Sequence, residues 1–157
     1  MILEAAMLIP AIVLLLVGMT QIAKVTYLYY TLRKAVYSVA TYLSNQQGVN
    51  FCDPNDPAIA TAIVFGLTGG SDPAQPVFVN GLTEAMIQVT AEHADPTTGA
   101  LSDYSALCVG SPAYVGSAPD YIVVSIPNGF QIQLRIPFLP IDPILLKPQV
   151  KVPYAGT

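Results

Sequence analysis

The sequence predicts an α+β protein in which a long hydrophobic N-terminal helix, kinked near Pro10, carries a small β-rich C-terminal head. Three observations support this prediction. Residues 1–19 are almost entirely apolar, and a helical repeat of apolar residues continues the segment. All but one of the 14 prolines lie beyond this segment. Later segments are rich in β-branched residues or alternate between apolar and polar, which is typical of strands. We therefore expect an assembly helix over residues 1–46 and a globular head over residues 47–157.

The composition limits the function classes. The chain has 157 residues, of which 53% are hydrophobic and only 10% charged, whereas about 25% charged is usual for a soluble domain. A chain this apolar is expected to cover its surface with lipid or with partner subunits. The net charge is −4 and the Lys and Arg residues are scattered. This argues against a nucleic-acid partner, which would require clustered basic residues.

The first predicted element is one helix of about 44 residues. Residues 5–19 form an uninterrupted apolar run, and about 20 such residues span a bilayer as a helix. No Lys or Arg precedes the run, which argues against a cleaved secretory signal peptide. From Ile22 to Leu43, apolar residues recur every three or four positions. The first half is therefore expected to be apolar on all sides and the second half amphipathic.

Four residues of this helix are candidate assembly positions. Pro10 removes one backbone donor, so we expect a kink or local melting there. Gly18 would let another helix approach closely. Glu4 places a carboxylate in an apolar helix, where ionisable residues are functional candidates. We expect it to pair with the α-amino group of Met1 of a neighbouring subunit. The alternative is that Glu4 lies at the level of the lipid headgroups.

Tyrosines are frequent in the second half of the helix. Tyr30 and Tyr37 lie seven residues apart on one face, and Tyr27 lies three residues before Tyr30. We expect these rings to pack between neighbouring helices or against the head, because Tyr combines a large apolar ring with a polar tip. An aromatic path for electrons is the less favoured alternative. The sequence has no C-x-x-C-H motif for haem attachment, and we expect no cofactor.

The head is predicted to begin with a short helix. Asp56 followed by Pro57 is typical of an N-cap and first helical position. Residues 68–76 contain two adjacent glycines and two prolines, which predicts a loop. Residues 86–92 alternate and are expected to form a strand.

The clearest strand pattern lies further along the head. Residues 121–126 are a β-branched run, and Asn128-Gly129 is a strong hairpin signal. Residues 130–136 alternate, so we expect them to return as the second strand of that hairpin. Residues 149–152 are expected to add a short strand. The prolines around it would keep the tail irregular or at a sheet edge.

Neither the cysteines nor the histidine indicates a catalytic or metal site. Cys52 and Cys108 lie far apart and match no zinc motif. A disulfide between them is expected if the chain lies outside the cytosol, and two buried free thiols are the alternative. His93 is the only histidine, and we expect it in a surface loop. No nucleophile, metal or phosphate-binding motif is present, so we expect no enzymatic activity.

These features resemble a known family. The string EAAMLIPAIVLLLVG at residues 4–18 resembles type IV pilins and pseudopilins, and specifically the TadE/TadG-like branch. The family's Glu usually lies at the fifth position after the cleavage point, whereas here it is the fourth residue. Further segments are also similar to that branch: residues 32–36, 40–43, 65–66, 79–83, 87–90 and 133–140.

The resemblance implies a function and its partners. Family members lose a short basic leader to a prepilin peptidase, so the chain is expected to be mature and to begin at Met1. It would reside in the inner membrane and then be polymerised by pilus assembly machinery into an extracellular helical filament of identical subunits. The implied role is a structural subunit in surface attachment. The alternatives are a minor pseudopilin that primes assembly and a single-pass, membrane-anchored periplasmic binding module.

Overall fold

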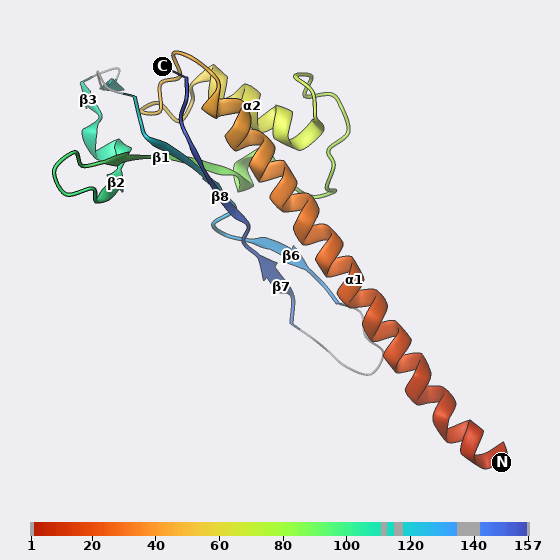
Figure 1. Cartoon of the computed structure of the whole chain (residues 1–157). Coiled ribbons are helices and arrows are strands. Elements are labelled where there is room, and N and C mark those ends of the chain that lie inside the picture. The colour runs from red at the N-terminus through yellow and green to blue at the C-terminus, as the bar shows by residue number, and fades with distance from the viewer. Residues whose placement is uncertain (1, 111–112, 115–117, 135–141, 157) are drawn as a thin grey trace.

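The computed structural model describes residues 2–110, 113–114, 118–134 and 142–156, with side chains described for 8–108, 118–134 and 142–156. A long N-terminal helix projects from a β-sheet head, which confirms the predicted α+β class (Figure 1). Helix α1 comprises Ile2–Ser44, 43 residues, or about 65 Å at 1.5 Å per residue.

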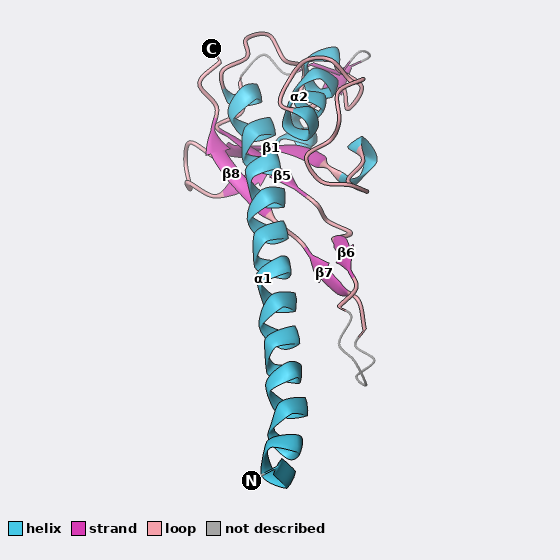
Figure 2. Ribbon diagram, turned by 90° about the vertical axis from the view of Figure 1, so that its right-hand side faces the viewer, coloured by secondary structure: helices cyan, strands magenta, loops and turns pink. Residues whose placement is uncertain are grey.

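Helix α1 runs unbroken through Pro10. The local melting considered for this position is wrong, and Figure 2 shows no sharp bend in this part of the helix. Proline removes one backbone hydrogen bond, and the long run of strong helix formers on both sides maintains the helix across this gap. The helix ends at Ser44, and Gly48 follows four residues later with a left-handed φ of 73°.

Helix α2 (Pro57–Thr68) confirms the predicted short helix. The side chain of Asp56 accepts a hydrogen bond from the backbone N–H of Ala58 at 2.8 Å, which satisfies an otherwise unpaired donor. Gly69 ends the helix in the left-handed conformation, with φ of 80°. The buried side chains of α2 pack on α1, where Tyr42 and Phe65 lie with their ring centroids 5.2 Å apart.

The main sheet contains four antiparallel strands in the order β2-β1-β5-β8. Their bounds are β1 Gln88–Ala94, β2 Leu101–Asp103, β5 Tyr121–Ser125 and β8 Gln149–Pro153. The strands predicted at residues 86–92, 121–126 and 149–152 are therefore confirmed to within a few residues. Strand β8 is at the edge of the sheet and ends at Pro153, as expected for a proline-rich tail.

The predicted hairpin between residues 121–126 and 130–136 is wrong. The Asn-Gly turn forms, with Gly129 at φ of 75° and its N–H donating to the carbonyl of Ile126 at 3.0 Å. The chain then leaves the sheet, and β6 (Phe130–Ile132) pairs with β7 (Ile144–Leu146). Strand β5 has only two edges, and these are already paired with β1 and β8. The returning strand therefore has no edge of β5 to join.

The core lies where α1 crosses the sheet. Figure 2 shows α1 running across one face of the sheet with α2 beside it. Alternate residues of β5 point toward the helices, and Ile122 and Val124 are fully buried there. The buried α1 residues recur at helical spacing and complete this core: Leu32, Ala35, Val36, Val39, Ala40 and Leu43. The second half of α1 is thus packed into the head, whereas residues 8–16 of the first half are all exposed.

Minor elements complete the described chain. They are the 3-10 turns η1 (Glu84–Met86) and η2 (Tyr104–Leu107), and a small ladder of β3 (Val109–Gly110) with β4 (Ala113–Tyr114).

Candidate functional site: the apolar stem and the tyrosine face

The N-terminal half of α1 is an apolar rod that the head leaves uncovered. We call residues 8–27 the stem. Residues 8–16 are all apolar and all exposed, and successive helical residues are 100° apart, so this part of the stem is apolar and open on every side. Further along, Val17, Gly18, Gln21 and Val25 are half-buried on one face, and Lys24 is exposed. Leu8 is 62% exposed and Met19 60%. Each such side chain would gain about 1.5–3 kcal/mol on complete transfer from water to an apolar environment.

The length of the stem matches a membrane. Among the described residues, Leu8–Ser44 is one helix long and apolar enough to cross a bilayer. The 20 residues of the stem would extend about 30 Å, which is the thickness of the hydrocarbon core. The buried positions of α1 begin only at Leu32. Helix α1 therefore has two parts: an N-terminal part that the described chain leaves largely exposed, and a C-terminal part that packs into the head.

The two threonine hydroxyls of the stem are satisfied within the helix. Thr20 donates to the carbonyl of Val17 at 2.8 Å, and Thr26 donates to the carbonyl of Ile22 at 3.0 Å. An unpaired polar group costs several kcal/mol in lipid or in a dry helix interface. These local bonds let both threonines enter an apolar environment without leaving a donor unpaired.

Gly18 and Gly66 lie in helices but in different surroundings. A Cβ built on Gly66 would lie 2.9 Å from the carbonyl oxygen of Ala35 and closer still to Val39, so α2 needs glycine there to reach α1. A Cβ built on Gly18 would meet nothing within 4 Å. Nothing in the described chain therefore requires a glycine at position 18. The predicted close approach of another helix would explain why a glycine stands at this position.

The Met1–Glu4 pair remains a prediction. Met1 lies outside the described residues, and the backbone of Glu4 belongs to the first turn of α1, but its side chain is outside the described set. Pro10 is exposed on the stem.

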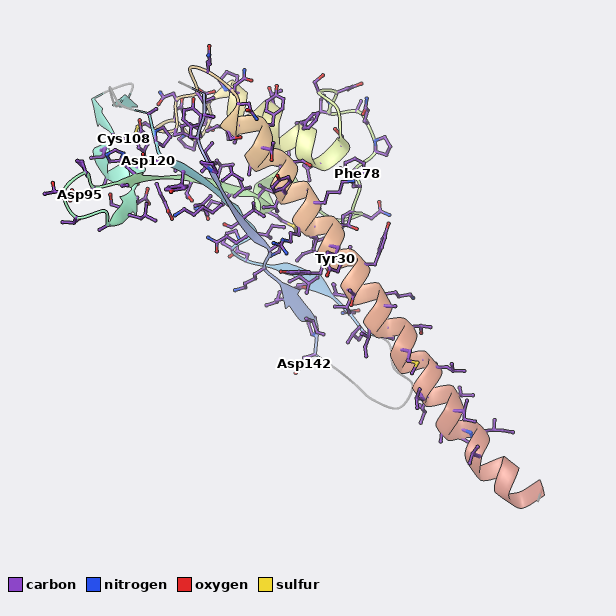
Figure 3. All side chains as sticks on the ribbon, in the orientation of Figure 1. Tyr30, Phe78, Asp95, Cys108, Asp120 and Asp142 are labelled. Carbon is purple, nitrogen blue, oxygen red and sulfur yellow. A yellow bond between two sulfur atoms is a disulfide. The ribbon has the colours of Figure 1, made fainter. Side chains whose placement is uncertain are left out.

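The tyrosine face lies opposite the core side of α1. We define it as Tyr27, Tyr30 and Tyr37, whose side chains are 74%, 63% and 54% exposed. The head thus leaves these rings largely open, and their packing against neighbouring helices remains a prediction. Tyr30 is visible in Figure 3 where the stem meets the head.

Two hollows meet along this face. One, of about 370 Å³, is lined by Tyr27, Tyr30, Lys34 and Phe78 among others. The second, of about 620 Å³, shares Tyr30 and Lys34 and is completed by residues of α1 and β8: Arg33, Tyr37, Gln149, Val150 and Lys151. Both are open and shallow in outline, and so suit a surface contact better than an enclosed small molecule.

Positive charge collects beside these hollows. Arg33 and Lys34 are exposed and make no ion pair with any residue that the structure describes. Lys151 differs, because its ammonium pairs with Glu92 and lies 4.4 Å from the ring centroid of Tyr121. Lys24 within the stem and Lys147 after β7 are likewise exposed without an ion pair among the described residues, so Arg33 and Lys34 are the adjacent pair of such cations just beyond the stem.

Sequence reasoning missed Phe78. This ring is 61% exposed and lies in the loop after α2, beside the tyrosine face (Figure 3). Its N–H donates to the carbonyl of Leu67 at 2.9 Å, which anchors the loop to the end of α2. The only signal in the sequence was an aromatic residue inside a segment of turn formers.

Cys52 and Cys108 form a disulfide, with their Cα atoms 5.6 Å apart. The bond joins the loop between α1 and α2 to the segment after η2 (Figure 3). The alternative of two free thiols is therefore excluded. Disulfides of this kind persist in oxidising compartments, which favours a head outside the cytosol.

His93 is placed in strand β1, so the expected surface loop is wrong. Its Nδ1 lies 2.8 Å from Oδ2 of Asp120, and the same oxygen accepts the N–H of Ala94 at 2.8 Å. The nearby Ser102 hydroxyl donates to the backbone carbonyl of His93 at 3.3 Å, so it is not arranged as a nucleophile beside the ring. This arrangement ties β1 to the segment before β5. No cluster of three metal-ligating side chains occurs among the residues described.

Fold and site together define a stem-and-head protein: a helix long and apolar enough to cross a membrane, and a disulfide-bonded α+β head. No family model, no curated protein and no solved structure matches this sequence.

Proposed function

We propose that this protein is a structural subunit of a bacterial extracellular filament of the type IV pilus kind, and that it is not an enzyme. The subunit is held in the inner membrane by its stem and is then polymerised through the same stem. The resemblance of residues 4–18 to TadE/TadG-like pilins supports this assignment.

One observation carries the proposal: residues 8–16 of the stem are apolar and exposed on all sides, although the other half of the same helix packs its apolar face into the head. A one-sided apolar stripe would suit a single partner, whereas an all-round apolar rod suits lipid or a bundle of several helices. A filament whose core is made of stems would bury every side at once.

Three further features support a helix bundle as the final environment. A Cβ at Gly18 would meet no described residue within 4 Å, the stem threonines are satisfied internally, and the tyrosine face is open for contact. The disulfide fits a head that is exported.

The test is to shear the cell surface, image the released material by electron microscopy and identify its main protein by mass spectrometry, including the N-terminal peptide. Filaments composed chiefly of this chain are the expected result, and the N-terminal peptide reports where the mature chain begins. Finding the chain only in the membrane fraction would contradict the proposal and favour a minor pseudopilin or an anchored binding module.

The same preparation tests the role of Glu4. We expect Glu4→Ala to reduce the filament yield while the protein still accumulates in the membrane, because an unpaired α-amino group would be buried between subunits. Glu4→Gln is the matched control for size, and it should fail in the same way if charge pairing is the cause. Normal filaments from both variants would instead place Glu4 at the headgroup level.

A further inference from the structure

We propose that, before assembly, the underside of the head rests in the interfacial layer of an anionic phospholipid bilayer. We define the underside as Tyr27, Tyr30, Arg33, Lys34, Phe78 and Leu145. This inference rests on the membrane stage of the proposed function, but it concerns a surface of the head and not the stem.

The position of the bilayer follows from the stem. If the apolar rod from Leu8 fills the hydrocarbon core, about 30 Å of helix places the boundary near Tyr27. Tyr27 is 74% exposed and Tyr30 lies about one turn further. Tyrosine is enriched at such boundaries, because its ring enters the apolar layer while its hydroxyl remains hydrated.

The head contributes apolar side chains at the same level. Phe78, 61% exposed, lines one hollow together with Tyr27 and Tyr30. Leu145, 47% exposed, belongs to the β6–β7 ribbon, which projects from the sheet toward the N-terminal end of α1 and runs beside it in Figures 1 and 2. Two segments far apart in the sequence thus present apolar groups on the side from which the stem emerges.

The charges nearest this surface favour anionic lipid. Arg33 and Lys34 lie two turns beyond Tyr27, at headgroup height, and they have no ion-pair partner among the described residues. Each Lys or Arg near an anionic bilayer contributes about a fivefold increase in binding. Asp142, exposed two residues before β7, adds one carboxylate at the end of the same ribbon (Figure 3), so Arg33 and Lys34 exceed it by one positive charge although the whole protein carries −4.

A second copy of the chain is the competing occupant. The underside continues directly from the membrane segment along α1, so anchoring of the stem brings it to the bilayer surface without a second subunit. The lipid layer is therefore the occupant that the observations favour.

The chain has no tryptophan, so single Trp residues can report on depth. We would reconstitute the full chain in phosphatidylcholine vesicles containing phosphatidylglycerol and measure quenching by brominated lipid acyl chains. Phe78→Trp and Leu145→Trp test the underside from two independent segments. Leu15→Trp is the positive control in the stem, and Leu101→Trp on β2, 49% exposed and at the far side of the head (Figure 1), is the negative control.

We expect quenching of the indole introduced at positions 15, 78 and 145 but not at 101. Adding Arg33→Gln with Lys34→Gln should lower the equilibrium constant for docking of the head, derived from quenching at 78, by about fivefold for each cation removed, without changing quenching at 15. Omitting phosphatidylglycerol or raising the salt concentration should have the same effect as the double substitution.

Other outcomes overturn the inference in distinguishable ways. Quenching at position 15 alone would leave the membrane stage intact and show that the head stands clear of the bilayer. No quenching at any position would contradict the membrane stage as well. If the Phe78→Trp variant shows blue-shifted emission in filaments, without quenching in vesicles, the underside belongs to a second copy of the chain.

Discussion

Gly66 of α2 lies directly against Val39 of α1, with no room for a side chain between the two helices. This contact sets how closely α2 approaches the half of α1 that is packed into the head. The described fold therefore requires a glycine at position 66, whereas it does not require one at position 18.

Gly66→Ala is therefore expected to destabilise the head by about 1–3 kcal/mol, because the added methyl group overpacks a closed contact. The substitution would otherwise gain up to about 1 kcal/mol of helix propensity. Thermal unfolding in mild detergent measures the effect, and Gly18→Ala is the matched control. Equal stability of both variants would show that α1 and α2 separate easily at this point.

Gly18→Leu is expected to leave the unfolding temperature of the head unchanged, since a Cβ at this position meets nothing within 4 Å. Filament yield after shearing should fall, because the larger side chain would hold neighbouring stems apart. Met19→Leu conserves volume at the adjacent position and should assemble normally. Wild-type filament yields from the Gly18→Leu variant would show that position 18 is not part of the assembly surface.

Cys52→Ser combined with Cys108→Ser is expected to lower the stability of the head by about 4 kcal/mol on the chain-entropy model. Denaturant unfolding of the double variant, beside the wild type with and without a reductant, measures this loss. The reduced wild type should match the double variant. If reduction changes nothing, then the head is held by its core alone.

A hydrogen bond joins the C-terminal segment to the chain just after α1, and the contribution of this bond to the stability of the head should depend on pH. The Tyr154 hydroxyl donates to the carbonyl of Gln46 at 2.8 Å, and partial burial raises the pKa of Tyr154 above its usual value of 10.0. The unfolded chain therefore loses this proton first as the pH rises. The stabilisation is complete below about pH 10 and disappears as the pH passes through the raised pKa.

Tyr154→Phe is the variant that isolates this effect. At neutral pH it should cost about 0.5–1.5 kcal/mol for the lost hydrogen bond. The difference from wild type should shrink above about pH 10, which denaturant unfolding at neutral and alkaline pH measures. A constant difference across this range would mean that Tyr154 acts only through its ring, which lies edge-on to Phe51 at 5.4 Å.

The sequence by itself determined the long helix, because residues 5–19 are apolar without interruption and the repeat beyond them has a helical period. It also determined the start of α2 and the strand at residues 121–126, because caps and β-branched runs act within a few residues.

Only the tertiary structure decided which strands pair and which side chains lie together. The Asn-Gly turn at residues 128–129 forms as its local chemistry dictates, but the strand after it joins β7, because both edges of β5 are occupied by strands distant in sequence. In the same way, Phe78 reaches the tyrosine face only because α2 packs on α1. Local preferences act along a few residues, whereas partner choice depends on which edges and surfaces the rest of the chain leaves free.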